Sequence, residues 1–309
     1  MKGEPHDYLG YRPDIDGLRA FAVMSVVLYH AFPSLLPGGF VGVDVFFVIS
    51  GFLISGIMFR ALQADHFSFS DFYARRVKRI FPALILVLAA SFVFAWFVLF
   101  DDELKQLGNH LLRAAAFLSN FILWHESGYF DNAAETKPLL HLWSLGIEEQ
   151  FYIVWPLIVW TLWRLKTWRW QLMCALVGAS FVWNVYQSQH DLTHDFYSPI
   201  TRFWELLCGA MLAYRGVVSK ASDKTAQMRT ALGTVLLVVA IVWIDADKQF
   251  PGAWALLPVM GAVLVISGNG QTWLGQTLFA NRLAVWIGTI SYPLYLWHWP
   301  VFSYARIIE

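Results

Sequence analysis

A guanidinium and an imidazole near the start of the chain are the first side chains that suggest chemistry. His30 lies inside the apolar residues 18–35, and Arg19 precedes it by eleven positions. Eleven helical steps of about 100° bring two side chains to within about 20° of one face, about 16 Å apart along the axis. Titratable groups inside a membrane are costly and usually serve function. We therefore predict that His30 is catalytic; a core histidine bonded to a neighbouring helix is the alternative.

A cluster of cations comprises Arg75, Arg76, Lys78 and Arg79 and stands immediately before the apolar residues 80–100. If a helix begins at 80, these charges lie at its N-terminal end, where positive charge opposes the helix macrodipole. A bound anion would remove the conflict, and the arginine fork matches phosphate oxygens. The cluster predicts a phosphate-bearing ligand; an orientation signal with lipid-phosphate contacts is the alternative.

A third polar group lies further along the chain, where His141, Glu148 and Tyr152 are spaced by seven and four residues. In one helix these three side chains share a face, whereas Glu149 is turned about 80° from His141. Glu148 and Glu149 are adjacent acids at the start of an apolar segment, and they are hard to explain as solvent-exposed surface residues. Stabilisation of their negative charge by the helix dipole near an N-terminus is the alternative explanation. We expect this face to receive a substrate from the outer side.

Three further groups have a structural and a functional interpretation. Asp44 enters an apolar stretch just after a glycine, Arg202 and Glu205 are spaced as an i, i+3 ion pair, and His298 stands between two tryptophans. The Arg202–Glu205 spacing indicates an internal structural pair. For Asp44 both readings stay open, and His298 belongs either to an interfacial aromatic belt or to the same cavity as the other histidines.

The composition shows what must position these residues. Of the 309 residues, 58% are hydrophobic and only 14% are charged, against roughly 25% charged in soluble domains. Three runs without Asp, Glu, Lys or Arg, at 80–100, 170–189 and 283–305, are each about the 20 residues that cross a bilayer as helix. A soluble single domain is excluded, and we predict an all-α, polytopic transmembrane helix bundle.

We expect about nine spans in a single membrane domain over residues 1–309, with no soluble domain. Ser70 is expected to cap a short surface helix, and residues 111–124 to be interfacial or re-entrant. The expected spans are residues 18–35, 40–62, 80–100, 144–163, 170–188, 199–214, 230–244, 253–268 and 283–304.

The basic residues set the expected orientation. If the N-terminus is cytoplasmic, most of the 22 Lys and Arg residues fall on inside segments, as the positive-inside rule requires. Cys174 and Cys208 fall inside spans, so we expect no disulfide framework, and we expect no removed signal peptide. Metal-ligand spacings, glycine-rich phosphate loops and nucleophile elbows are absent from the sequence, so we expect no metal, no Rossmann site and no serine hydrolase. We also expect no nucleic-acid partner.

Five stretches of the chain resemble the integral-membrane acyltransferase family 3. They cover residues 12–20 followed by His30, residues 42–53, 75–82, 141–152 and 291–300, in the order in which that family carries them. The resemblance implies a multi-pass protein of the bacterial inner (cytoplasmic) membrane that O-acylates cell-surface sugars such as lipopolysaccharide or peptidoglycan. Such proteins have ten or eleven spans, so we expect a C-terminally truncated chain, and a fused or separate extracytoplasmic SGNH-type domain is an expected partner.

The resemblance also implies roles for the residues above. Cytoplasmic acetyl-CoA, or another acyl-CoA, would be the donor, and His30 would act as general base or as a transient acyl carrier. The expected catalytic residues are His30, Arg19, Glu148 and Glu149; the donor-binding residues are Arg75, Arg76, Arg79 and Arg19; and the acceptor-binding residues are His141, Asp44 and His298.

A different class of function uses the same residues. Intramembrane His, Glu and Arg side chains also occur in proton-coupled secondary transporters of small anionic solutes. Such transporters commonly show inverted repeats and paired broken spans, and the sequence shows neither. The enzyme is therefore the favoured hypothesis.

Overall fold

The computed structural model describes residues 11–127, 134–165, 167–216, 223–245, 247–268 and 270–308. Within these ranges every regular element is helical, which confirms the predicted all-α class. Short 3₁₀ turns lie at Gly39–Val41, Ala134–Thr136 and Gly252–Ala255, and a π-helical turn lies at Gly275–Phe279. The α-helices are α1 (Pro13–Ala31), α2 (Gly42–Gln63), α3 (Phe69–Val98), α4 (Asp101–Ala115), α5 (Ser119–Glu126), α6 (Leu142–Arg164), α7 (Arg169–His190), α8 (Leu192–Tyr197), α9 (Pro199–Tyr214), α10 (Asp223–Trp243), α11 (Leu256–Ser267), α12 (Arg282–Thr289) and α13 (Ser291–Ile308).

Several helices are suited to a membrane by length and composition. The second half of α3 exposes a row of large apolar side chains, among them Ile85, Val93 and Phe97, and an apolar surface of this extent suits contact with lipid. The helical segments of the described residues that are long and apolar enough to cross a bilayer are Gly39–Gln63, Phe69–Val98 and Lys224–Trp243.

The count of nine spans and the cytoplasmic N-terminus remain predictions. The predicted orientation uses three basic residues that lie outside the described residues, namely Lys2, Lys166 and Lys220. The N-terminal segment before residue 11 lies outside them as well.

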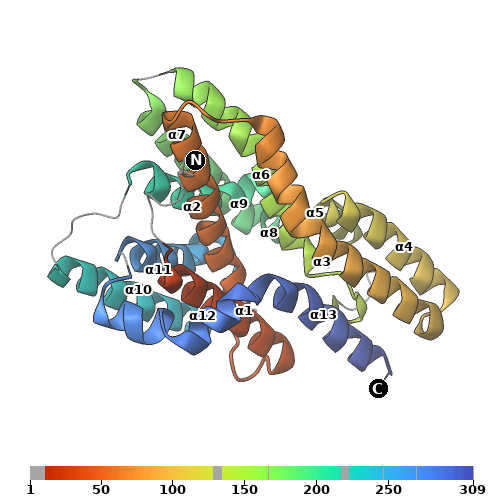
Figure 1. The fold of residues 1–309 in the computed structure, drawn as a ribbon. Coiled ribbons are helices and arrows are strands. Elements are labelled where there is room, and N and C mark those ends of the chain that lie inside the picture. The colour runs from red at the N-terminus through yellow and green to blue at the C-terminus, as the bar shows by residue number, and fades with distance from the viewer. Residues whose placement is uncertain are drawn as a thin grey trace, which may run out of the picture.

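Helices α1 and α2 form the middle of the bundle, where α2 packs against α9 and α1 against α12 (Figure 1). In this view α3 and α13 lie to one side of them and α10 and α11 to the other. The backbones of α2 and α9 touch: a Cβ on Gly51 would lie 1.8 Å from the Leu206 carbonyl oxygen, and one on Gly209 would lie 2.0 Å from that of Val48. Only glycine fits at both positions, and the contact brings the charged residues of α9 against α2.

The third helix differs from the prediction in a way that matters for the site. It begins at Phe69 rather than at 80, and its cap is Ser68, whose Oγ accepts a hydrogen bond from the Asp71 backbone N–H (3.3 Å). The expected cap at Ser70 is therefore wrong. The cations at 75–79 lie within a continuous helix, so the predicted conflict with the helix macrodipole does not arise. The apolar run at residues 80–100 therefore corresponds to the apolar second part of α3 and does not mark the start of the helix.

Two expected single segments are each divided. The span expected at 283–304 is split into α12 and α13, because Pro293 lacks the N–H that would bond the Thr289 carbonyl four residues earlier. The piece expected at 111–124 is split between α4 and α5 at Phe117, whose φ of 58° is left-handed and ends the helix before it.

Candidate active site

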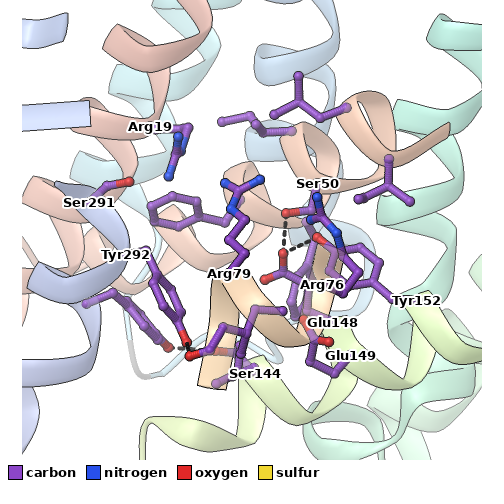
Figure 2. A pocket seen from close by; sticks show the side chains of 18 of the residues that line it. Arg19, Ser50, Arg76, Arg79, Ser144, Glu148, Glu149, Tyr152, Ser291 and Tyr292 are labelled. Carbon is purple, nitrogen blue, oxygen red and sulfur yellow. Dashed lines mark hydrogen bonds between the residues drawn. The ribbon is translucent and has the colours of Figure 1, made fainter. Parts of the chain in front are cut away.

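A first cavity, the arginine cavity, is bordered by α1, α2, α3, α6 and α13 (Figure 2). Figure 2 shows the Arg79 side chain in its middle, with Arg19 on one side and Glu148 on the other. Its volume is about 100 Å³. Its polar lining residues are Arg19, Ser50, Arg76, Arg79, Ser144, Glu148, Glu149, Tyr152, Ser291, Tyr292 and Tyr295.

A second cavity, the histidine cavity, is larger, with a volume of about 380 Å³. Aromatic side chains form a large part of its walls, and carboxylates of three segments, Asp44, Glu135 and Asp245, line it. Its polar and aromatic lining residues are Tyr29, His30, Phe40, Asp44, Glu135, His141, Trp143, Phe196, Tyr197, Arg202, Asp245, Lys248, Phe250, Tyr295, Trp299 and Arg306.

Val43 of α2 and Tyr295 of α13 line both cavities. The Tyr295 hydroxyl donates to the His141 carbonyl oxygen (3.0 Å) and lies 2.6 Å from the Ser144 hydroxyl. Val43 and Tyr295 therefore form a common wall, with Arg19, Arg76 and Arg79 on one side of it and His30 on the other. Arg19 and His30 reach the two cavities from one helix, α1.

The hydrogen bonds around His30 assign its tautomer. His298 Nδ1 lies 2.6 Å from the Tyr295 carbonyl oxygen, and His298 Nε2 lies 3.0 Å from His30 Nδ1. A carbonyl oxygen only accepts, so Nδ1 of His298 carries the proton, and Nε2 of a neutral ring is then an acceptor. His30 Nδ1 must donate to it. The lone pair of His30 therefore lies on Nε2, as an orienting partner arranges it in nucleophile–base systems.

Neighbouring groups hold the position of His30. The Trp299 ring packs edge-on against the imidazole with 4.4 Å between centroids, and Arg306 donates to the His30 carbonyl oxygen (2.6 Å). His141 lies beside His298, with ring centroids 5.5 Å apart, and its Nε2 donates to the Leu296 carbonyl oxygen (3.1 Å). Its Nδ1 is buried without a hydrogen-bond partner among the described residues.

The acidic residues of α6 lie in the arginine cavity. Glu148 accepts hydrogen bonds from the Ser50 hydroxyl (2.5 Å) and from the Tyr152 hydroxyl, and the Arg76 guanidinium lies 5.8 Å above the Tyr152 ring. The predicted shared face of Glu148 and Tyr152 is confirmed. The face expected to receive one substrate is divided, because Glu148 lines the arginine cavity, as Glu149 does, whereas His141, seven residues before Glu148, lines the histidine cavity.

The predicted basic cluster divides between the cavity and the surface. Arg76 and Arg79 line the arginine cavity together with Arg19, while Arg75 is exposed and lies outside the lining. Arg19 also forms the predicted i, i+3 ion pair with Asp16, at 3.2 Å. The structure thus brings together three of the four guanidinium groups expected at the donor site.

Asp44, Arg202 and Glu205 form a buried ion triad, and two of its members, Asp44 and Arg202, line the histidine cavity. Arg202 Nη2 lies 2.8 Å from Asp44 Oδ1, and Arg202 Nε lies 3.1 Å from Glu205 Oε1. All three residues are 0% exposed. The predicted Arg202–Glu205 pair is confirmed, but sequence reasoning missed Asp44 as its third member because the two helices are joined only in the fold.

Asp195 is a further buried acid that sequence reasoning missed. It lies on the short α8, in the segment that connects α7 and α9, and accepts hydrogen bonds from the Asn184 side-chain amide (3.2 Å) and the Gly252 backbone N–H (3.3 Å). Burial raises the pKa of the Asp195 carboxyl from its usual 3.8 to about 7, although the two hydrogen bonds and Arg202 oppose the shift.

Comparison with known proteins gives a family match and several similar relatives. Residues 12–308 match the family model described as "Acyltransferase domain". The chain is 35% identical over 328 aligned positions to a Bacillus subtilis protein named "Putative peptidoglycan O-acetyltransferase YrhL", a match that covers 100% of this chain and 51% of the relative. No solved structure gives a significant match.

Two further relatives are similar to about the same degree. "Peptidoglycan O-acetyltransferase OatA" of Listeria monocytogenes is 31% identical over 310 positions, which are 95% of this chain and 50% of the relative. A Staphylococcus aureus "Putative O-acetyltransferase" is 32% identical over 315 positions, which are 96% of this chain and 51% of the relative. The chain thus spans about half the length of the curated relatives it matches.

Proposed function

The chain belongs to the acyltransferase-domain family, and we propose that it transfers an acyl group, above all acetyl, from acetyl-CoA or another acyl-CoA to a sugar hydroxyl of the cell surface. One observation carries the proposal: guanidinium groups and a correctly oriented imidazole lie in two cavities that share one wall. A donor with phosphates requires cations, and a hydroxyl acceptor requires a base. Acyl transfer from such a donor needs cations where the phosphates bind and a base where the acyl group meets the hydroxyl.

The arginine cavity is the proposed donor site. Arg76 and Arg79 would bind the phosphates of coenzyme A through charge-assisted hydrogen bonds, and Arg19 would hold the thioester end nearer to α1. Glu148 is already bonded by Ser50 and Tyr152, so we assign it to positioning the arginines rather than to contact with the sugar. Arg75 has no part in this site and serves as a control.

The histidine cavity is the proposed acceptor site. Aromatic faces with a few convergent polar groups are the usual lining of a ligand site, and a volume of about 380 Å³ suits a sugar unit better than the arginine cavity does. Because two relatives carry peptidoglycan in their names, we propose a peptidoglycan sugar as acceptor rather than lipopolysaccharide. A fused or separate SGNH-type domain stays a prediction.

His30 is the proposed general base. As the acceptor hydroxyl attacks the thioester carbonyl carbon, its proton passes to His30 Nε2, a C–O bond forms and the C–S bond breaks. The proton then neutralises the departing thiolate of coenzyme A. His298 is a positioning residue in this scheme, because its bond to His30 Nδ1 keeps the lone pair on Nε2.

Acyl transfer is tested with purified protein in detergent, acetyl-CoA and a peptidoglycan fragment. The proposal expects free coenzyme A thiol to appear only when the acceptor is present, with the acetyl group recovered on the sugar. A transporter of small anions would release no thiol, and that result, with correctly folded protein, would overturn the proposal.

The donor side is proposed to be cytoplasmic, with the N-terminus inside, because the positive charges of α3 lie at its first half. Asp65 and Asp102 flank this helix on opposite ends and are both exposed. After removal of Cys174 and Cys208, Asp65→Cys should be shielded from impermeant thiol reagents in intact cells, and Asp102→Cys should be labelled. Labelling of Asp65→Cys with shielding of Asp102→Cys would contradict the proposed orientation and place the donor side outside the cell.

A further inference from the structure

We propose that Val43 and Tyr295 form a constriction between the two cavities, and that its width selects the length of the acyl group that reaches His30. This inference rests on the proposed acyl transfer. It adds what the transfer itself leaves open, which is how one chain distinguishes acetyl from longer thioesters.

The two side chains are the residues common to the linings of both cavities. Val43 is 8% exposed and lies in the first turn of α2, while Tyr295 lies in the second turn of α13. A donor held by Arg76 and Arg79 is therefore separated from His30 by these two groups, and the acyl end must pass between them to meet the imidazole.

The Tyr295 ring is held in place. Its hydroxyl is bonded to the His141 carbonyl oxygen and to the Ser144 hydroxyl, and its ring lies 6.2 Å from Phe46 and 5.3 Å from His298, centroid to centroid. A swing of the ring would break both hydrogen bonds. The opposite side of the constriction is equally defined, because the β-branched Val43 has one strongly preferred rotamer in a helix.

Tyr295 also connects the constriction to the chemistry. Its carbonyl oxygen accepts the hydrogen bond from His298 Nδ1 that fixes the tautomer of His30. The side chain of Tyr295 thus lines the constriction, and its backbone carbonyl holds the histidine that orients His30. An acyl group that passes beside the Tyr295 ring would enter the cavity that His30 lines.

The expected selectivity follows from the size of the missing group. A hydrophobic site distinguishes substrates that differ by one methylene by about 10- to 200-fold. Val43→Ala removes two methyl groups from the constriction, so the ratio of butyryl to acetyl transfer should rise by about tenfold or more. Val43→Ile should change the ratio in the opposite direction.

The experiment measures initial rates of acyl transfer with acetyl-CoA, propionyl-CoA and butyryl-CoA, per folded molecule in detergent. Val45→Ala is the matched control, because Val45 is a fully buried valine of the same helix that lines neither cavity. The inference expects the ratio to change in the Val43 variants and to stay at the parent value in Val45→Ala.

Two results would overturn the constriction. One is an unchanged butyryl-to-acetyl ratio in Val43→Ala with acetyl transfer intact, and the other is the same change in Val45→Ala. If Val43→Ala does not fold, an unchanged ratio in Val43→Ile overturns it equally. Absence of transfer from every thioester by the parent protein would instead overturn the proposed function, and this inference with it.

Discussion

The two cavities differ in how their charges are arranged. In the arginine cavity, three guanidinium groups and two carboxylates line about 100 Å³, and Arg79 is exposed enough to meet a ligand. In the histidine cavity, His30 is bonded to His298, which is bonded to a backbone carbonyl, and Arg202 forms a buried ion triad with two carboxylates. We propose that this difference reflects separate roles, in which the arginine cavity would bind a charged donor and the histidine cavity would transfer a proton.

The largest effect is expected at the imidazole. His30→Ala should lower acyl transfer by about 10²- to 10⁴-fold, the usual contribution of a general base, while the protein still inserts into the membrane. His30→Gln keeps a hydrogen bond to His298 but has no base. Turnover per folded molecule is the measurement, and activity of His30→Gln within about threefold of the parent would make His30 a core histidine.

The next effect should fall on stability rather than on turnover. Arg202→Ala leaves Asp44 and Glu205 buried without a counter-charge, which should destabilise the protein by about 3–5 kcal/mol. Replacing an arginine of the other cavity should cost little stability, because Arg76 and Arg79 are less buried. Thermal unfolding in detergent distinguishes the two cases; equal melting temperatures for Arg202→Ala and Arg76→Ala would contradict the buried triad.

A smaller effect is expected at the donor site. Arg76→Ala with Arg79→Ala removes charge-assisted hydrogen bonds to phosphate, each typically worth about 1.5–3 kcal/mol, so the KM for acetyl-CoA should rise by about tenfold or more. Arg75→Ala is the matched control, because Arg75 belongs to the same helix but lies outside the cavity. Steady-state kinetics measure the KM for acetyl-CoA in the double variant and in Arg75→Ala. An equal rise in KM in Arg75→Ala would mean that the cluster acts only through its overall positive charge.

The apolar runs of the sequence predicted the existence and type of the helices well, because burial in lipid requires long uncharged segments. They located helix ends poorly, since α3 continues through its polar first half once Ser68 caps it. Local spacing predicted the Glu148–Tyr152 contact. It did not predict the wall at Tyr295, because that residue reaches the site from another helix.

The same reason explains the other missing features of the site. Asp44 and Arg202 are 158 residues apart, and their contact depends on the glycines that let α2 and α9 touch. Periodicity describes one helix at a time. It therefore grouped residues of one helix but did not predict which cavity each of them lines.

The smallest expected effect concerns Asp195 and pH. Because its folded pKa of about 7 exceeds the unfolded 3.8, the folded state holds a proton that the unfolded chain has lost between these values. The resulting stability is full below about pH 4, falls as the pH rises toward 7 and stays lost above it. Asp195→Asn remains neutral, so its melting temperature should fall less than that of the parent between pH 5 and pH 8, a range chosen around this pKa. If the melting temperatures of the two proteins fall equally over this pH range, the shifted pKa of Asp195 is contradicted.

The separation of donor binding from proton transfer is tested most directly by the affinity for acetyl-CoA, measured by calorimetry on His30→Ala and on the Arg76→Ala, Arg79→Ala double variant. The two-cavity account predicts that His30→Ala binds acetyl-CoA within about threefold of the parent although it transfers the acetyl group about 10²- to 10⁴-fold more slowly, while the double variant binds about tenfold or more weakly. If His30→Ala loses as much affinity as the double variant, or if the double variant binds like the parent, donor and base share one site and the account is contradicted.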